Sequence, residues 1–312
     1  MGKFFLSYEE QLKKLREEKA LNILDKDYAF EMLKRYSYYS LISGYKKEFK
    51  NPDTTLYRSD VYFEDIVALY EFDENLRGLF LKYLQKIERQ IKSYISYYFC
   101  EKYGELQEKY LDIYNYNYIG KNKRDIDRLV QILGKYTNGH TDYHYINHAY
   151  IKYNNVPLWV LTNALTFGNI SKFYLVSKYD IQAKIARNYT GIRESHLSKM
   201  LIVLTQFRNI CAHGERLYCY HTKQAVPDLL LHQKLDIPKK SQEYIYGKHD
   251  LFAVVLSMRY LLPNDWFLSF KKELIKVIRQ YVERTSCFSE KQILKFMGFP
   301  ENWTAITRYR MK

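Results

Sequence analysis

Apolar residues recur at helical spacing along almost the whole chain, and this pattern constrains the fold more than any other feature. The longest such stretch runs from about residue 62 to residue 103, with an interruption expected near residues 73–75. Its apolar residues lie on one face of a helix, and they are Leu76, Leu79, Phe80, Tyr83, Leu84, Ile87 and Ile91. The pattern predicts an all-α fold without a sheet of three or more strands.

Start and stop signals predict the other helices. Ser7 is typical of an N-cap before an acidic first turn, and Asp27 is expected to open the next helix. Pro157 favours a helix start, and Gly168 with Asn169 is expected to break that helix. The expected helices cover about residues 7–19, 27–43, 124–136, 157–167, 170 onward, 194–220, 249–261, 265–284 and 289–297.

The charge balance indicates a polyanionic partner. The chain has 49 Lys and Arg against 35 Asp and Glu, a net charge of +14, and the excess is concentrated in residues 172–216 and 271–312. Its 33 Tyr residues would offer flat surfaces for unpaired bases. A biased base composition of the source explains the Tyr count equally well.

The sequence also argues against several locations and cofactors. It has no uncharged apolar run of 18 residues and no apolar core in its N-terminal segment, so neither a membrane span nor a signal peptide is expected. Its four Cys residues form no CxxC pair, which is typical of reduced thiols rather than of disulfides or a zinc site. We therefore expect a cytoplasmic protein without a cofactor or a bound metal.

The segment from Arg208 to His213 carries the candidate chemistry. On a helix these two residues lie about 140° apart around the axis, whereas Asn209 and His213 share a face, so Asn209 could orient the imidazole. Gly214 is expected to end, kink or thin the helix beside them. An imidazole can move protons at the 2′-hydroxyl or the 5′-oxygen of RNA, and a guanidinium can bind the scissile phosphate. No metal is required for this chemistry.

Taken alone, Arg-x4-His is a weak signal, and a helix-capping His beside a surface Arg is the alternative interpretation. One Arg and one His are also a sparse catalytic set. A two-fold dimer that apposes two such helices would supply two of each residue in one cleft.

Several segments in order make the signal more specific. The stretch from Arg208 to Tyr218 resembles the signature of the Abi-like family of abortive-infection proteins, which includes AbiD and AbiF. The resemblance runs from about residue 30 to residue 220. It also covers Tyr39-Ser40-Leu41-Ile42-Ser43-Gly44-Tyr45 with Phe49, Leu69 to Glu88, and Pro157-Leu158-Trp159 to Ser171, and Met297-Gly298-Phe299-Pro300 to Trp303 resembles a common ending.

This resemblance implies a HEPN-type helical bundle with additional helices. It implies one all-α domain over residues 1–312, with a HEPN-like core at 30–220 and a C-terminal helical extension at 221–312. The implied function is a metal-independent endoribonuclease toxin in phage defence or a toxin–antitoxin system, restrained by a structured noncoding RNA and active as a homodimer. Arg208, Asn209 and His213 would be catalytic, and the RNA-binding residues would be Lys172, Arg193, Lys199, Arg208 and Arg216. A non-catalytic RNA-binding or RNA-sensing scaffold is the alternative.

Other candidate residues have a functional and an ordinary interpretation. His140, His144 and His148 are spaced four apart, which suits a metal site on one helix, but Gly139 suggests a helix start inside the segment. Glu88 lies among Lys and Arg and is more typical of an i,i+4 ion pair than of a catalytic acid. Cys211 could be a reactive thiol beside Arg208, although a small core filler is the more common role.

Overall fold

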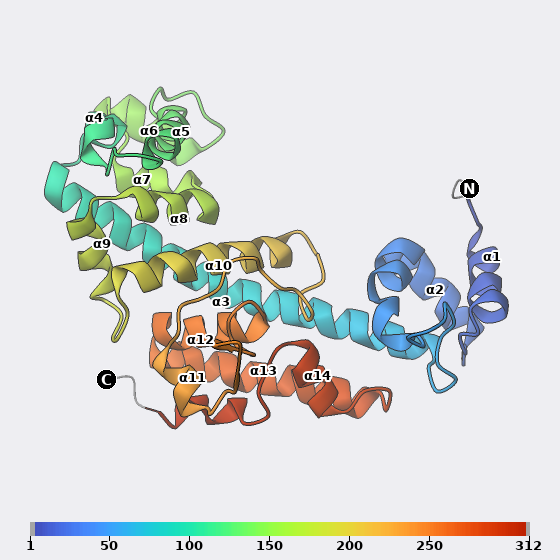
Figure 1. Cartoon of the computed structure of the whole chain (residues 1–312). Coiled ribbons are helices and arrows are strands. Elements are labelled where there is room, and N and C mark those ends of the chain that lie inside the picture. Colours follow the sequence, from blue (N-terminus) through green and yellow to red (C-terminus); the bar gives the residue numbers. More distant parts are fainter. Residues whose placement is uncertain (1–3, 310–312) are drawn as a thin grey trace.

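The computed structural model describes residues 4–309, and within them the fold is all-α, as the apolar spacing predicts (Figure 1). Only one small antiparallel sheet accompanies the helices there, formed by β1 and β2. The elements are α1 (Tyr8–Lys13), α2 (Lys26–Tyr36), α3 (Phe63–Tyr103), α4 (Gln107–Leu111), α5 (Asn122–Gly134), α6 (His144–Tyr153), α7 (Leu158–Leu161), α8 (Phe167–Val176), α9 (Tyr179–Ala186), α10 (Glu194–Ala212), α11 (Leu230–Lys234), β1 (Lys239–Lys240), β2 (Glu243–Tyr244), α12 (Leu251–Leu261), α13 (Asn264–Arg284) and α14 (Glu290–Phe296).

Helix α3 is the central axis of the molecule. It has 41 residues and crosses the whole molecule, with α1 and α2 at one end and α4–α9 around the other (Figure 1). Helices α10 and α13 pack along its length and bury the predicted apolar stripe, including Leu76 and Phe80. The C-terminal segment therefore lies against the same long helix as the segment that carries the Arg-x4-His motif.

The prediction of an interruption near residues 73–75 is wrong, because α3 continues through these residues. Asp73 is a polar residue on a buried face, which made a break plausible. In the structure, the side chains of Tyr45 and Arg77 donate to its carboxylate at 2.7 and 2.8 Å. A buried polar group with such partners does not have to leave the helix.

Helix α10 is shorter than the expected range of 194–220. It ends at Ala212 because Gly214 adopts a left-handed φ of +69°. The amide of Glu215 donates to the carbonyl of Ile210 at 3.1 Å, and the amide of Gly214 donates to that of Cys211 at 3.4 Å. These two bonds form a Schellman motif, the common way in which a glycine ends a helix.

Two other boundaries also differ from expectation. Gly168 and Asn169 lie inside α8, whose N-cap is Thr166, so the break falls before them. The N-cap of α2 is Asp25 rather than Asp27, since the Asp25 carboxylate accepts the amides of Asp27 and Tyr28. The same helix ends at Tyr36, before the positive φ of Ser37, and a short π-helical turn at Tyr39–Ser43 follows.

Helices α1, α5, α12, α13 and α14 begin and end within a few residues of their predicted positions, whereas the short helices α4, α6, α9 and α11 were not predicted. Ser7 caps α1 as expected, and helix α12 is buried at every residue. Among residues 4–309, no helix is both long enough and apolar enough to span a bilayer.

Candidate functional site

The end of α10 presents the imidazole of His213 to solvent. His213 is the C-cap residue, with its amide donating to the carbonyl of Asn209 at 2.9 Å. Its backbone ψ of 2° is no longer helical, and its side chain is exposed. The Schellman turn at Gly214 therefore places a titratable group at the tip of a rigid helix, as the sequence suggested.

Arg208 is held by a buried carboxylate of α3. Its Nε lies 3.3 Å from Oε2 of Glu88, while Nζ of Lys92 lies 3.0 Å from the other oxygen of the same carboxylate. Glu88 is only 5% exposed, so these two cations compensate its charge in a poorly solvated place. Glu88 forms the expected i,i+4 ion pair with Lys92, and it also positions Arg208, which its place in the sequence did not show.

Asn209 has a different neighbour from the one expected. Its Oδ1 accepts from a terminal nitrogen of Arg208 at a long 3.5 Å. Among residues 4–309, no hydrogen bond joins the side chains of Asn209 and His213. The i,i+4 spacing is kept in the backbone, where the amide of His213 donates to the carbonyl of Asn209, but the side chain of Asn209 contacts Arg208 instead.

The chain after His213 is anchored by the buried carboxylate of Asp73. Besides Tyr45 and Arg77, the amides of Leu217 and Tyr218 donate to it at 3.1 and 2.7 Å. Burial raises the pKa of Asp73 above its usual value, and these donors oppose that shift by stabilising the carboxylate. Three chain segments are thereby fixed around one side chain, directly behind the motif.

The sequence alone did not predict this role of Asp73, although Asp73, Arg77 and Tyr45 lie in segments that resemble the Abi-like family. A signal was present, since Asp73 and Arg77 are an i,i+4 pair of opposite charges within an otherwise apolar stripe. Such a pair on a buried face indicates a partner elsewhere in the chain.

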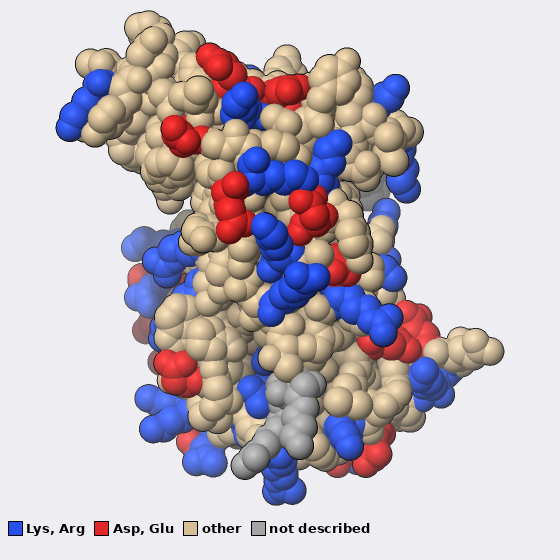
Figure 2. All heavy atoms as spheres, turned by 90° about the vertical axis from the view of Figure 1, so that its left-hand side faces the viewer, with Lys and Arg blue, Asp and Glu red and all other residues tan. Residues whose placement is uncertain are grey.

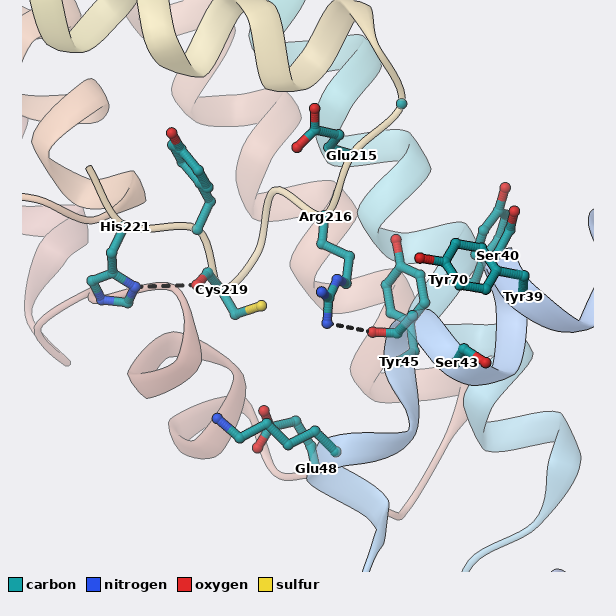
Figure 3. A pocket seen from close by; sticks show the side chains of 14 residues that line it. Tyr39, Ser40, Ser43, Tyr45, Glu48, Tyr70, Glu215, Arg216, Cys219 and His221 are labelled. Carbon is teal, nitrogen blue, oxygen red and sulfur yellow. Dashed lines mark hydrogen bonds between the residues drawn. The ribbon is translucent and has the colours of Figure 1, made fainter. Parts of the chain in front are cut away.

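A pocket of about 700 Å³ opens beside the motif (Figure 3). Its wall begins at Gly214, the residue after His213, and continues to His221; the opposite wall comes from residues 39–48 and from Tyr70. Tyr39, Tyr45 and Tyr70 lie together on one side, and His221 and Cys219 lie on the other. The side chain of Arg216 lies between them and donates to the carbonyl of Gly44 at 2.6 Å. The pocket thus combines aromatic side chains with a cation, and one of its walls begins at the residue that follows His213.

The predicted RNA-binding residues are spread over two helices and one loop. Arg193 and Lys199 are exposed on or beside α10, and Arg216 is exposed in the pocket wall. Lys172 of α8 pairs with Asp125 of α5 at 2.9 Å, so part of its charge is compensated. Figure 2 shows one face of the molecule on which Lys and Arg side chains form a band, with Asp and Glu interleaved at its upper edge. Their role in binding RNA stays a prediction.

The other candidate residues can now be placed. Helix α6 begins at His144, so His140 lies outside the helix that carries His148. Within residues 4–309, no group of three or more His, Cys, Asp and Glu is arranged to hold a metal ion. Burial raises the pKa of the Cys211 thiol to about 12, which leaves it protonated and packed in the core near neutral pH.

Comparison with known proteins gives one match. A family model described as Abi-like protein matches residues 31–219, about three fifths of the chain. The match contains the Arg-x4-His segment, Asp73 with its partners, and the pocket walls up to Cys219, and it ends before α11–α14. No curated protein and no solved structure was found to match the chain.

Proposed function

The chain belongs to the Abi-like protein family, and on this premise we propose that it is a metal-independent endoribonuclease of the HEPN type. Membership in the family indicates a role in abortive infection, a form of phage defence. The observation that carries the proposal is the end of α10. There an exposed His213 follows Arg208, which is paired with a buried carboxylate, and the next residue, Gly214, lines a pocket of about 700 Å³ that also contains three tyrosines from the N-terminal segment and α3.

The proposed reaction is an internal transesterification of RNA. A base takes the proton of the 2′-hydroxyl, the 2′-oxygen attacks phosphorus, and the 5′-oxygen leaves with a proton. The products are a 2′,3′-cyclic phosphate and a 5′-hydroxyl. His213 is the proton-transfer group, and Arg208 stabilises the extra negative charge on the phosphate in the transition state.

The pairing of Arg208 with Glu88 supports this role. The buried carboxylate of Glu88 lies 3.3 Å from Nε, an ion-pair contact that attracts the guanidinium toward α3 although Nε forms no aligned hydrogen bond. The terminal nitrogens stay on the exposed side, where bidentate contact with a phosphate is favourable. Preorganised donors of this kind need little rearrangement during the reaction.

RNA is the proposed partner, and the active form is a proposed homodimer. The charge of +14 favours a polyanion, and the tyrosines of the pocket offer stacking surfaces for unpaired bases next to the scissile bond. A two-fold axis near the end of α10 would bring a second His213 to the cleft, so that one imidazole serves as base and the other as acid. A structured noncoding RNA is the proposed antitoxin.

The test is cleavage of labelled RNA in EDTA, with the ends identified. Cleavage with 2′,3′-cyclic phosphate ends supports the proposal, whereas a wild-type protein that cleaves no RNA, before and after removal of any co-purified RNA, contradicts it. Mixing His213→Ala with Arg208→Ala tests the dimer, because a shared cleft would recover activity that neither variant has alone.

A non-catalytic RNA-binding scaffold is the second candidate, and the Glu88 pair also favours it, since an arginine already held by a carboxylate can contact phosphate without reacting. Absorbance at 260 nm of the purified protein, salt-dependent binding and no cleavage would support this function.

A further inference from the structure

A second polar cavity lies on the far side of α3 from the motif. It has a volume of about 270 Å³ and is lined by Gln90 and Tyr94 of α3, by residues 188–190 after α9, and by residues 259–264 between α12 and α13. Its lining residues come from the loop that follows α9 and from the first turn of α13, and both segments can be found in Figure 1. We call it the Arg259 cavity.

Arg259 brings a buried positive charge to this cavity. It is only 9% exposed, and its terminal nitrogens donate to the side-chain oxygen of Asn264 at 3.1 Å and to the carbonyl of Tyr309 at 3.3 Å. Both acceptors are neutral, and within residues 4–309 no carboxylate forms an ion pair with Arg259. Burial of the guanidinium lowers the pKa of Arg259. Buried arginines are normally paired, so the charge here is available to a ligand.

Three lining side chains have buried polar atoms without a hydrogen-bond partner. These atoms are Nε of Arg259, Oη of Tyr189 and Oε1 of Gln90. Tyr189 is 6% exposed, so water does not readily reach its hydroxyl. Most buried polar groups in folded proteins have a partner, and three exceptions around one cavity indicate a missing ligand.

The start of α13 adds further donors. This helix of 21 residues begins at Asn264 with Pro263 as an N-cap that provides no side-chain acceptor. Its first amides have no acceptor within the helix and mark the positive end of the helix dipole. Asp265 in the first turn is the acidic side chain closest to them in sequence, and it is exposed.

The surroundings are also positively charged. Burial lowers the pKa of Lys271, and repulsion from Arg308 and Arg259 lowers it further. Lys271 donates to neutral oxygens of Thr304 and Thr307. Lys271 and Arg308 thus add positive charge near Arg259, although neither of them lines the cavity.

We propose that the Arg259 cavity binds a phosphate group, carried either by a mononucleotide or by the end of an RNA chain. A phosphate brings about −1.5 to −2 charges and three strong acceptor oxygens, which match donors from the guanidinium, the Tyr189 hydroxyl and the amide of Asn264 at the start of α13. The Gln90 amide can turn its nitrogen toward the same group. The cavity of about 270 Å³ holds the phosphate, and Tyr94 at its edge can stack on an attached base. This site does not depend on cleavage by His213.

The first test is thermal unfolding in phosphate against chloride at equal ionic strength. Phosphate should raise the Tm of the wild type by binding the folded state. Thr190→Asp puts a negative charge at the exposed rim and should weaken phosphate binding at least about tenfold, equivalent to about 1.4 kcal/mol. Thr55→Asp adds the same charge to an exposed loop elsewhere and should change nothing. Arg259→Gln should abolish phosphate binding. If Arg259→Gln does not fold, the comparison of Thr190→Asp with the wild type tests the proposal.

The second test identifies the source of the phosphate. Adenosine monophosphate is compared with inorganic phosphate, and RNA with a 5′-phosphate is compared with the same RNA ending in a 5′-hydroxyl. A preference for the mononucleotide, or for the phosphorylated RNA, that disappears in Thr190→Asp assigns the source. The proposal is overturned if phosphate leaves the wild type unchanged or stabilises Thr190→Asp and Thr55→Asp equally. His213→Ala should bind phosphate normally, which separates this site from the proposed nuclease.

Discussion

Two arginines on either side of α3 show how one helix can create two different kinds of site. Glu88 of α3 supplies a buried carboxylate 3.3 Å from Nε of Arg208. Two residues later, Gln90 supplies only an amide to the cavity that contains Arg259. Because successive helical residues point in different directions, the two side chains serve opposite faces of the same helix.

The difference lies in what each arginine can still do. Arg208 is half-buried, and its pairing fixes the direction of the guanidinium while leaving its ends toward solvent. Arg259 is buried among neutral acceptors, and its charge is uncompensated in the described structure. A held arginine suits repeated contact with a reacting phosphate, whereas an uncompensated one suits stable binding of an anion.

The largest effect should separate the two sites by activity. His213→Ala removes the proton-transfer group and should lower RNA cleavage about 10²–10⁴-fold, with RNA binding and the circular dichroism spectrum nearly unchanged. Thr190→Asp at the Arg259 cavity should leave cleavage of 5′-hydroxyl RNA close to normal. His148→Ala, an exposed histidine on α6, is the matched control. Full cleavage and full cell toxicity in His213→Ala would show that the motif is structural.

The next effect concerns stability behind the motif. Asp73→Ala leaves Arg77 buried without its carboxylate and removes the acceptor of the Leu217 and Tyr218 amides, so unfolding should require about 3–5 kcal/mol less. Chemical denaturation measures the change. Glu101→Ala breaks the exposed pair with Lys184 and should change the stability very little, because solvent screens exposed ion pairs. Equal losses in the two variants would contradict the anchoring role of Asp73.

A third change makes Arg208 resemble Arg259. Glu88→Gln removes the carboxylate but keeps the shape of the side chain. The positive charge of Arg208 is then no longer compensated by Glu88, and its guanidinium is less restrained. RNA should bind slightly more tightly, and the cleavage rate at saturating RNA should fall about tenfold, equivalent to about 1.4 kcal/mol of transition-state stabilisation. Glu273→Gln, which breaks a pair with Lys82 on the outside of α3, is the control. If Arg208 needs no positioning, Glu88→Gln will cleave at the rate of that control.

The smallest effect is a pH dependence in the C-terminal region. His232 is fully buried, with its Nε2 2.9 Å from the carbonyl of Gly247, and burial lowers its pKa below 6.5. His232 therefore binds a proton more readily in the unfolded chain than in the folded protein. The stability contributed by the neutral, buried His232 is complete above pH 6.5 and declines as the pH falls. The loss by pH 5 should be at most about 2 kcal/mol. Denaturation curves of His232→Gln should show a shallower decline than those of the wild type, and His148→Ala should keep the wild-type decline.

Much of the fold could be predicted from local signals. Helical spacing predicted the helices, Ser7 predicted the cap of α1, and the glycine after His213 marked the neighbourhood of the end of α10. Predictions of helix boundaries were wrong where a polar residue has a hydrogen-bond partner far away in the sequence. Asp73 keeps α3 continuous because Tyr45 and the amide of Tyr218 reach it from other segments. Gly168 does not break α8 because Thr166 caps that helix just before it.

By itself, the sequence determined that the fold is all-α and that Arg208 and His213 lie five residues apart near a helix end. Periodicity, capping residues and glycines act over a few positions, so they can be read locally. Only the tertiary structure decided that Glu88 pairs with Arg208, that the Asn209 side chain contacts Arg208, and that Arg259 is buried without a carboxylate partner among residues 4–309. The physical reason is that burial and charge compensation depend on which segments pack together, and those segments are separated by up to hundreds of residues.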